Sequence, residues 1–267
     1  MFPRHHSSRY GKGNRGVNPR NSQEDMMRTS LKKIVVTGGS RGLGRALALR
    51  FSAIGHEVFI VGRNEDQLRL VQELEPKIQY LAADVSDKDQ IYKISGAIGG
   101  GLGHPDFVVQ CAGYLGMSPL KLLVDSPCED FEKVLDTNLL GPFRLTKALF
   151  PMMVANGGGT FVNISSDAAI HNYETWGTYS ASKAAMDRMT GIFHEESKGF
   201  QINHLALDPG EMATDMYFAA DPDRDPATLQ KPEDVAEAMV DFLLKGNFQQ
   251  SRYSREEWQN AIKGDAS

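Results

Sequence analysis

The sequence predicts an α/β protein in which a doubly wound parallel sheet is covered by helices on both faces. Short apolar runs suited to buried strands alternate with stretches in which apolar residues recur at helical spacing. The links between these segments are short, as they are in consecutive strand–helix units joined right-handedly. The first unit, Leu31–Ile54, also places a glycine-rich turn between its strand and its helix.

Each expected strand is apolar and rich in β-branched residues, which suits a position inside a parallel sheet. In chain order the expected strands are Ile34–Val36, Glu57–Val61, Ile78–Ala82, Phe107–Gln110, Thr160–Ile164 and Ile202–Leu207. The expected helices are Leu43–Ile54, Asp66–Leu74, a helix from Ser86 or Asp87 to Ile98, Glu129–Val154, Thr178–Ser197 and Pro232–Lys245. The glycine-rich piece 96–103 is superficially similar to a phosphate-binding turn. It follows a helix and not a strand, however, so we expect a flexible connector there.

Length and composition indicate one globular domain, which we place at residues 31–267. The chain has 267 residues, of which 41% are hydrophobic and 24% charged. A net charge of −5 gives no electrostatic support for a nucleic-acid partner. No apolar run reaches the roughly 18 residues of a membrane span, so no membrane partner is expected. The two cysteines have no metal-site or disulfide-framework spacing, which predicts no metal site and a cytoplasmic location.

The first 30 residues are expected to form a disordered basic extension. Residues 1–20 contain five basic residues and no acid, and they lack the apolar segment of a secretory signal. Two alternatives stay open. The segment is also similar to an organelle transit peptide, and Met26 or Met27 would be the true start if the first codon were assigned too early.

The turn Thr37–Gly44 predicts a phosphate-binding site. A strand, a glycine-rich turn and a helix in this order direct free backbone N–H groups and the positive end of a helix dipole at one point. Gly38, Gly42 and Gly44 would allow a sharp turn and the close approach of a phosphate. A tight turn without a ligand is the alternative.

Two arginines near this turn favour NADP over NAD. A free ribose 2′-hydroxyl usually meets an acid at the end of the second strand, but here that place holds Gly62 and Arg63. Arg41, in the glycine turn, is a second cation. Guanidinium groups bind a 2′-phosphate bidentately, whereas solvated surface charges would be the alternative.

Tyr179 and Lys183 carry the predicted chemistry. They are four residues apart on an expected helix and therefore share one face. A neighbouring ammonium group is expected to lower the pKa of the phenol, so that Tyr179 exchanges protons with a substrate oxygen near neutral pH. Ser166 follows the fifth strand at the same edge of the sheet, where its hydroxyl would hydrogen-bond the same oxygen.

Seven short motifs, in this order, resemble the short-chain dehydrogenase/reductase family in its single-domain form. They are TGGSRGLG (37–44), DVSD (84–87), CAG (111–113), the Asn138 of DTNLLGPF, ISS (164–166), YSASK (179–183) and PGEMAT (209–214). The resemblance covers residues 31–244. It implies a three-layer Rossmann fold and hydride transfer between NADP(H) and a carbonyl or alcohol substrate.

The resemblance also implies roles for particular residues. Tyr179 would be the general acid in reduction and the base in oxidation, and Lys183 would bind the nicotinamide ribose while keeping that pKa low. Ser166, chosen over Ser165 by its separation from Tyr179, would hold the substrate oxygen, and Asn138 would position a water that feeds protons to Lys183. The implied cofactor-binding residues are Gly38, Ser40, Arg41, Gly42, Leu43, Gly44, Arg63, Asp84, Val85, Cys111, Ala112, Gly113, Tyr179, Lys183, Pro209, Gly210, Met212 and Thr214.

The chain departs from the family pattern in two places. Gln110 and Cys111 stand where the family has two asparagines, and we expect a local packing change with Cys111 as a small buried residue. After Lys245 the usual Asp-Gly-Gly turn is missing, although a short strand around Arg252 and Tyr253 fits the pattern. The tetramer contact made by that end in relatives is therefore open, and a homodimer or homotetramer is expected through the helices 129–154 and 178–197.

Substrate identity is not encoded in these motifs. Tyr173 and Trp176 either line the substrate pocket or serve in packing, and Asp215–Lys231 lies where the family places its lid, here short and acidic. The favoured function is a carbonyl reductase or alcohol dehydrogenase. The alternatives are a catalytically silent NADP(H)-sensing regulator on the same fold, and an isomerase or dehydratase that uses the cofactor transiently.

Overall fold

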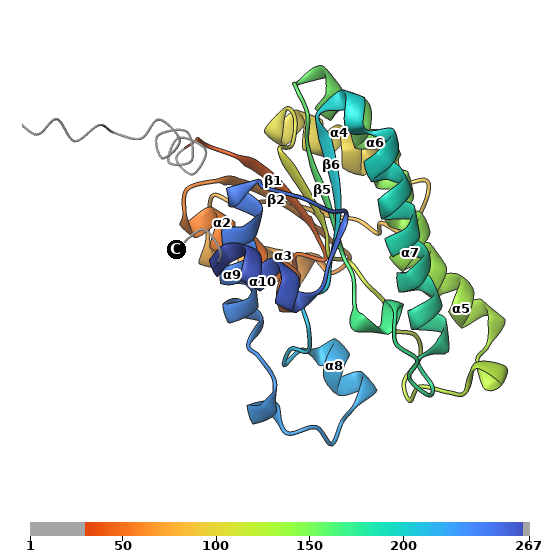
Figure 1. Cartoon of the computed structure of the whole chain (residues 1–267). Helices are drawn as coiled ribbons and strands as arrows, with labels where there is room; N and C mark the ends of the chain where they lie inside the picture. Colours follow the sequence, from red (N-terminus) through yellow and green to blue (C-terminus); the bar gives the residue numbers. More distant parts are fainter. Residues whose placement is uncertain (1–29, 264–267) are drawn as a thin grey trace, which may run out of the picture. The chain divides into compact units, whose positions relative to one another are not determined.

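The computed structural model describes residues 30–263, so the prediction for the N-terminal extension lies outside the described residues. In this part of the chain seven parallel strands form one sheet in the order β3-β2-β1-β4-β5-β6-β7 (Figure 1). The strands are β1 (Lys33–Thr37), β2 (Glu57–Gly62), β3 (Gln79–Ala82), β4 (Phe107–Gln110), β5 (Gly159–Ile164), β6 (Ile202–Leu207) and β7 (Arg252–Tyr253). The chain moves outward from β1 to β3 and then returns to β4 beside β1. The topological switch point, where such sheets bind ligands, therefore lies between β1 and β4.

Helices cover both faces of this sheet, which confirms the predicted three-layer, doubly wound α/β fold. The longer helices are α2 (Gly42–Ala53), α3 (Glu65–Leu74), α4 (Ile91–Leu102), α5 (Cys128–Leu135), α6 (Gly141–Ala155), α7 (Gly177–Glu196), α9 (Pro232–Lys245) and α10 (Arg255–Lys263), and α8 (Asp215–Ala220) is a shorter one. Figure 1 shows α4, α6 and α7 on one side of the strands and α2, α9 and α10 on the other.

Two apolar cores separate these layers. Successive side chains of β1 point to opposite faces, so Ile34 and Val36 pack with α2, α3 and α9, whereas Val35 packs with α4 and α6. Both cores contain fully buried residues from the central strands. The near-continuous apolar runs that predicted these strands are thus explained by burial on both faces.

The predicted flexible connector at 96–103 is wrong, because α4 continues through Leu102. Its glycines are used for close packing. A Cβ atom at Gly101 would lie 3.2 Å from the ring of Phe59 on β2, and one at Gly99 would lie 3.1 Å from Met152 on α6. Helix α4 also begins later than expected, at Ile91 instead of near Ser86.

The predicted helix 129–154 is interrupted. Residues Asp136–Leu140 form a π-helical turn between α5 and α6, so that the helical course continues with one local widening that contains Asn138. Close packing accompanies this turn, since a Cβ atom at Gly141 would lie 2.8 Å from the carbonyl oxygen of Val85.

The C-terminal segment adds the short strand β7, as expected, and a helix that was not predicted. Helix α10 places Trp258 in the core with no exposed surface, where its Nε1 donates to the carbonyl oxygen of Asp208 at 2.8 Å. Among the described residues, no helix is both long and apolar enough to cross a membrane.

Candidate active site

One cavity of about 730 Å³ lies at the carboxyl ends of the strands. The loops after β1, β2, β3, β4, β5 and β6 all contribute to its wall, as the topology of a doubly wound sheet requires. It is lined by every predicted cofactor-binding residue: Gly38, Ser40, Arg41, Gly42, Leu43, Gly44, Arg63, Asp84, Val85, Cys111, Ala112, Gly113, Tyr179, Lys183, Pro209, Gly210, Met212 and Thr214. Of the four predicted catalytic residues, Asn138 is the one that does not line it.

The glycine turn forms a cradle that only glycine permits. Gly38 has a φ of 69°, and a Cβ atom there would lie 2.8 Å from the backbone nitrogen of Ala112. A Cβ atom at Gly44 would clash with the carbonyl oxygen of Gly38. Helix α2 starts here with no side-chain cap and no acid in its first turn. Its N-terminal amides are therefore available to an anion, and the cradle fits the pyrophosphate of a dinucleotide.

Arg41 and Arg63, the two residues predicted to bind a 2′-phosphate, line the cavity, and each has a carboxylate nearby. Arg41 lies 3.5 Å from Asp215, and Arg63 lies 3.9 Å from Asp84. The side chains of Arg41 and Arg63 are 59% and 56% exposed, so each pair is weak and a bound phosphate can compete with it.

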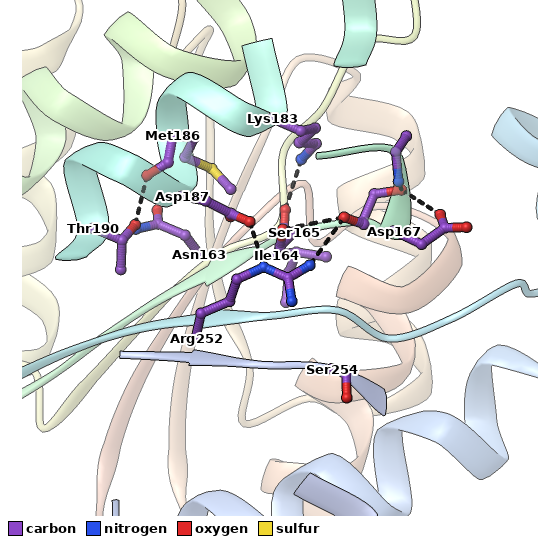
Figure 2. A network of polar contacts seen from close by, with 12 residues as sticks. Asn163, Ile164, Ser165, Asp167, Lys183, Met186, Asp187, Thr190, Arg252 and Ser254 are labelled. Carbon is purple, nitrogen blue, oxygen red and sulfur yellow. Dashed lines mark hydrogen bonds and ion pairs between the residues drawn. The ribbon is translucent and has the colours of Figure 1, made fainter. Parts of the chain in front are cut away.

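Tyr179 and Lys183 lie close together in the wall of the cavity. Both are buried on α7, and the Lys183 Nζ atom lies 5.5 Å from the centre of the Tyr179 ring. The ammonium group also donates to the carbonyl oxygen of Ile164 at 2.6 Å (Figure 2). The last residue of β5 thus helps to fix the position of the amine near the phenol.

The predicted lowering of the tyrosine pKa is wrong for this arrangement. Burial raises the pKa of Tyr179 above its ordinary value, and the carboxylates of Asp208 and Asp167 add to the rise, while a hydrogen bond with Ser166 opposes it. Burial also lowers the pKa of Lys183 to about 8. Desolvation is the largest cause of both shifts, because the interior disfavours the charged form of each group. Tyr179 is therefore a neutral phenol at pH 7.

Ser166 lies beside Tyr179 at the end of β5. Its hydroxyl accepts from the backbone nitrogen of Ala168 at 3.1 Å and donates to Asp167 Oδ1 at 3.0 Å. This pattern caps the short helical turn 167–169 and holds the hydroxyl at the cavity wall. Rotation of its O–H would allow the same hydroxyl to donate to a substrate oxygen instead.

Asn138 lies behind the cavity, in the π-helical turn, and is 1% exposed. Its Oδ1 accepts from the backbone nitrogen of Tyr114 at 2.8 Å, and its Nδ2 donates to the Tyr114 carbonyl at 2.8 Å and to Ser182 Oγ at 3.0 Å. Ser182 in turn donates to the carbonyl of Tyr179 at 2.7 Å. This side chain joins the loop after β4 to the helix that carries Tyr179.

The loop after β4 shows how the chain accommodates its departure from the family motif. Gln110 is buried, and its Nε2 donates to Thr146 Oγ1 on α6 at 3.0 Å. The neighbouring Cys111 is a half-buried free thiol packed against the core. Burial raises its pKa to about 11, so it is a protonated thiol at neutral pH.

Aromatic and apolar side chains form another part of the cavity wall. Trp176 lies 5.8 Å from Tyr179 and 6.2 Å from Tyr173 between ring centres, and all three rings line the cavity. Leu115 and Met216 complete this wall, the second of them on α8, inside the predicted lid segment. The structure thus places Tyr173 and Trp176 in the pocket, one of the two alternatives left open by the sequence.

Sequence reasoning missed several acids of the cavity, among them Asp167, Asp208 and Glu211, which follow β5 and β6. Asp208 is 6% exposed, and burial raises its pKa. Only their positions directly after β5 and β6 could have indicated them, because all strand ends meet at one edge. Within residues 30–263 no cluster of three or more histidine, cysteine or acidic side chains is arranged to hold a metal ion.

Comparison with known proteins decides the family. Residues 32–225 match the family model described as short chain dehydrogenase. The chain belongs to the short-chain dehydrogenase family. This assignment confirms the resemblance carried by the seven motifs, and it makes the chain an oxidoreductase by family. The family binds nicotinamide cofactors, and the uncapped glycine cradle described above fits such a group.

Several relatives support the same assignment. The chain is 32% identical to carbonyl reductase family member 4 of Danio rerio, over 80% of this chain and 91% of that protein. It is 34% identical to a short chain dehydrogenase of Pseudocercospora fijiensis over 69% of this chain, a match that spans 61% of the fungal protein. A short chain dehydrogenase of Escherichia coli CFT073, solved in complex with NADPH, superposes with a TM-score of 0.77 at 26% identity, covering 86% of this chain and 99% of that one.

Proposed function

We propose that this chain is an NADP(H)-dependent oxidoreductase that transfers a hydride between the nicotinamide and a carbonyl or alcohol carbon. The observation that carries the proposal is the meeting of Ser166, Tyr179 and Lys183 in the same cavity as the glycine cradle. The nicotinamide supplies the hydride when it is bound. In the reductive direction, the neutral phenol of Tyr179 gives its proton to the substrate oxygen, which the Ser166 hydroxyl holds by a hydrogen bond.

Lys183 has two tasks in this proposal. One N–H of its ammonium is used by Ile164, and the others remain for the ribose hydroxyls of the cofactor. Its charge also stabilises the phenolate that forms when Tyr179 loses its proton. Asn138 supports the proton relay by fixing the backbone around Tyr114 and, through Ser182, the start of α7.

Arg41 and Arg63 support a preference for NADP over NAD. They stand at the ends of the first two loops, where a 2′-phosphate would replace the weak contacts to Asp215 and Asp84. Solved relatives agree with this preference, since the Escherichia coli protein was captured with NADPH and a similar Shigella flexneri protein with NADP.

Two assays test the function. The rate of NADPH oxidation, followed by its absorbance, should rise with at least one member of a panel of ketones, aldehydes and quinones. The Tyr179→Phe variant should lose turnover while still binding NADPH. Binding of NADPH by the wild type with no turnover of the whole panel would favour a silent NADP(H)-sensing regulator instead.

The choice of cofactor is tested separately by titration with NADPH and NADH, and the double change Arg41→Glu, Arg63→Asp should weaken NADPH binding selectively.

The proposed assembly is a homodimer or homotetramer that pairs α5–α6 and α7 of two chains. Ile192 on α7 is 50% exposed, and Phe200, which is 47% exposed, lines a small apolar cavity together with Phe150 and Phe193. Phe200→Glu should therefore reduce the molecular mass measured by light scattering. The single domain at 31–267 and a cytoplasmic location are part of the same proposal, and the two free cysteines agree with the latter.

A further inference from the structure

The C-terminal strand β7 contributes a cation next to the active site that the family motifs do not include. The Arg252 Nε atom donates to Asp187 Oδ2 at 2.7 Å, and its Nη2 atom donates to the carbonyl oxygen of Ser166 at 3.3 Å (Figure 2). Asp187 is on α7, one turn after Lys183. One guanidinium group thus connects the loop that carries Ser166 with the helix that carries Tyr179 and Lys183.

This contact is largely enclosed. The side chains of Arg252 and Asp187 are 25% and 11% exposed, and Asp187 Oδ1 is buried without a hydrogen-bond partner among the described residues. The carboxylate therefore depends on Arg252 for its compensation. A planar guanidinium group can satisfy a carboxylate and a carbonyl at once, whereas a lysine in its place would offer a single charged nitrogen.

The position of Arg252 is itself fixed by the sheet. Backbone nitrogens of Ala206 and Asp208, on and just after β6, donate to the carbonyl oxygens of Ser251 and Tyr253 at 2.7 and 3.0 Å. The side chain of Trp258 holds the Asp208 carbonyl from α10. The segment after α9 is thus hydrogen-bonded to the strand that ends at the active site.

We propose that Arg252 is a positioning residue of the active site, which holds the Ser166 loop against α7 and neutralises Asp187 beneath Lys183. The inference rests on the proposed function. Arg252 does not line the cavity, so its effect would reach the substrate through Ser166 and through the charge around the catalytic pair.

The charges around the pair give the expected direction of a pH effect. Cys111, Asp187 and Asp208 act on Lys183, and Asp208, Asp167 and Cys111 act on Tyr179, in addition to its hydrogen bond with Ser166. Arg252 opposes these acids, and it lowers the pKa of Asp208 directly. Loss of its charge makes the surroundings more negative, which raises the pKa of both members of the pair.

Three variants distinguish the effect of Arg252 on the position of Ser166 from its effect on the charge around Tyr179 and Lys183. Their activity is measured with the carbonyl substrate that the wild type reduces fastest. Arg252→Gln should lower kcat by about tenfold or more, since a displaced hydroxyl costs that much, and should move the alkaline limb of the kcat/KM profile to higher pH. Arg252→Gln combined with Asp187→Asn removes both charges. It should return the limb toward the wild-type pH while kcat stays low. Arg252→Lys should keep the limb and recover part of kcat.

A second ion pair provides a control outside the cavity. Arg50 on α2 contacts Glu237 on α9 at 3.1 Å, with side chains 34% and 61% exposed, and neither residue lines the cavity. Arg50→Gln should change thermal stability while kcat and the pH profile stay as in the wild type. Binding of NADPH, measured by fluorescence, should change less than about twofold in all these variants, because neither arginine lines the cavity.

The outcomes are distinct. If Arg252→Gln behaves like Arg50→Gln, with altered stability alone, Arg252 is a structural residue and the inference is overturned. The double variant, which leaves no uncompensated buried charge, decides the matter where the single variant does not fold. Failure of the wild type to reduce any substrate in the panel would overturn the proposed function, and this inference with it.

Discussion

Lys183 and Tyr179 lie one turn apart on α7, with the amine 5.5 Å from the centre of the phenol ring and tied to the end of β5 through Ile164. The hydrogen bond from the Lys183 ammonium to the Ile164 carbonyl does not depend on a bound ligand. The amine is therefore held in place by the sheet, and its charge state becomes the variable that conditions can change.

Lys183 is expected to make cofactor binding sensitive to alkaline pH. Burial lowers its pKa to about 8, so the group is charged below that pH and neutral above it. A neutral amine donates weaker hydrogen bonds to ribose hydroxyls. The dissociation constant of NADPH should therefore rise as the pH passes through about 8. Fluorescence titration at several pH values measures this, and Lys183→Met should bind more weakly without the same inflection.

Gly44→Ala is expected to weaken NADPH binding. A Cβ atom at this position would clash with the carbonyl oxygen of Gly38, which is backbone and cannot move without deforming the cradle. We expect a loss of at least about tenfold in affinity, a loss of contacts worth roughly 1.4 kcal/mol. Calorimetric titration would test it. Unchanged affinity would mean that the cradle does not hold the pyrophosphate.

Gly100→Ala is expected to stabilise the protein. Gly100 lies inside α4, and a Cβ atom there would meet no atom within 4 Å. Replacing glycine by alanine in an open helical position raises the free energy of unfolding by about 0.5–1 kcal/mol. Urea denaturation followed by circular dichroism measures the change. A flexible connector would show no such gain, and Gly96→Ala, also with open space, provides a second test.

His204 is expected to make the fold sensitive to acid. It is 1% exposed, stacked between Phe161 and Phe193 with ring centres 5.0 Å away on each side, and burial lowers its pKa to about 4. Above pH 6.5 the ring is neutral in both the folded and the unfolded chain. Below that pH the unfolded chain takes up a proton that the folded one refuses, so stability falls by up to about 3 kcal/mol on approaching pH 4.

The variant His204→Phe keeps an aromatic ring in this stack and should flatten the pH dependence of the urea midpoint between pH 6.5 and about 4. His171→Gln serves as the control, because within residues 30–263 the one aromatic ring that His171 contacts is Tyr173. An acid response identical to that of the wild type in His204→Phe would show that other groups cause it.

Trp258→Phe is expected to cost about 1 kcal/mol of stability, and Trp258→Ala about 3–5 kcal/mol. The first change removes the hydrogen bond to the Asp208 carbonyl and keeps most of the buried surface, whereas the second leaves a cavity under α10. Thermal unfolding monitored by calorimetry would rank the two variants. Equal stability of both would mean that α10 does not pack as described.

Much of the fold could be predicted because its signals are local. An apolar run such as 107–110 predicts a strand that is buried in a parallel sheet. A glycine-rich turn such as 37–44 predicts the connection from a strand to the next helix. The glycines of α4 misled the prediction, since their use depends on Phe59 and Met152, which are distant in sequence. The π-helical turn at Asn138 was missed for the same reason, because the contacts that support it are made with Tyr114 and Ser182, which are also distant in sequence.

The candidate site could likewise be predicted only in part from the sequence. The sequence predicted that Tyr179, Lys183 and the expected cofactor-binding residues share one site, and they line one cavity because parallel strand ends converge on one edge. The direction of the Tyr179 pKa was missed, since it depends on burial and on Asp208 and Asp167. The bond between Arg252 and Ser166 joins residues 86 positions apart, and no spacing rule connects them.

The brevity of β7 has a consequence for the behaviour of the protein at high concentration. The strand pairs with β6 over just two residues, 252 and 253, before the chain turns into α10. An outer strand that short offers little unpaired backbone as a template for another chain. This outer strand should therefore be a poor template for strand-to-strand aggregation.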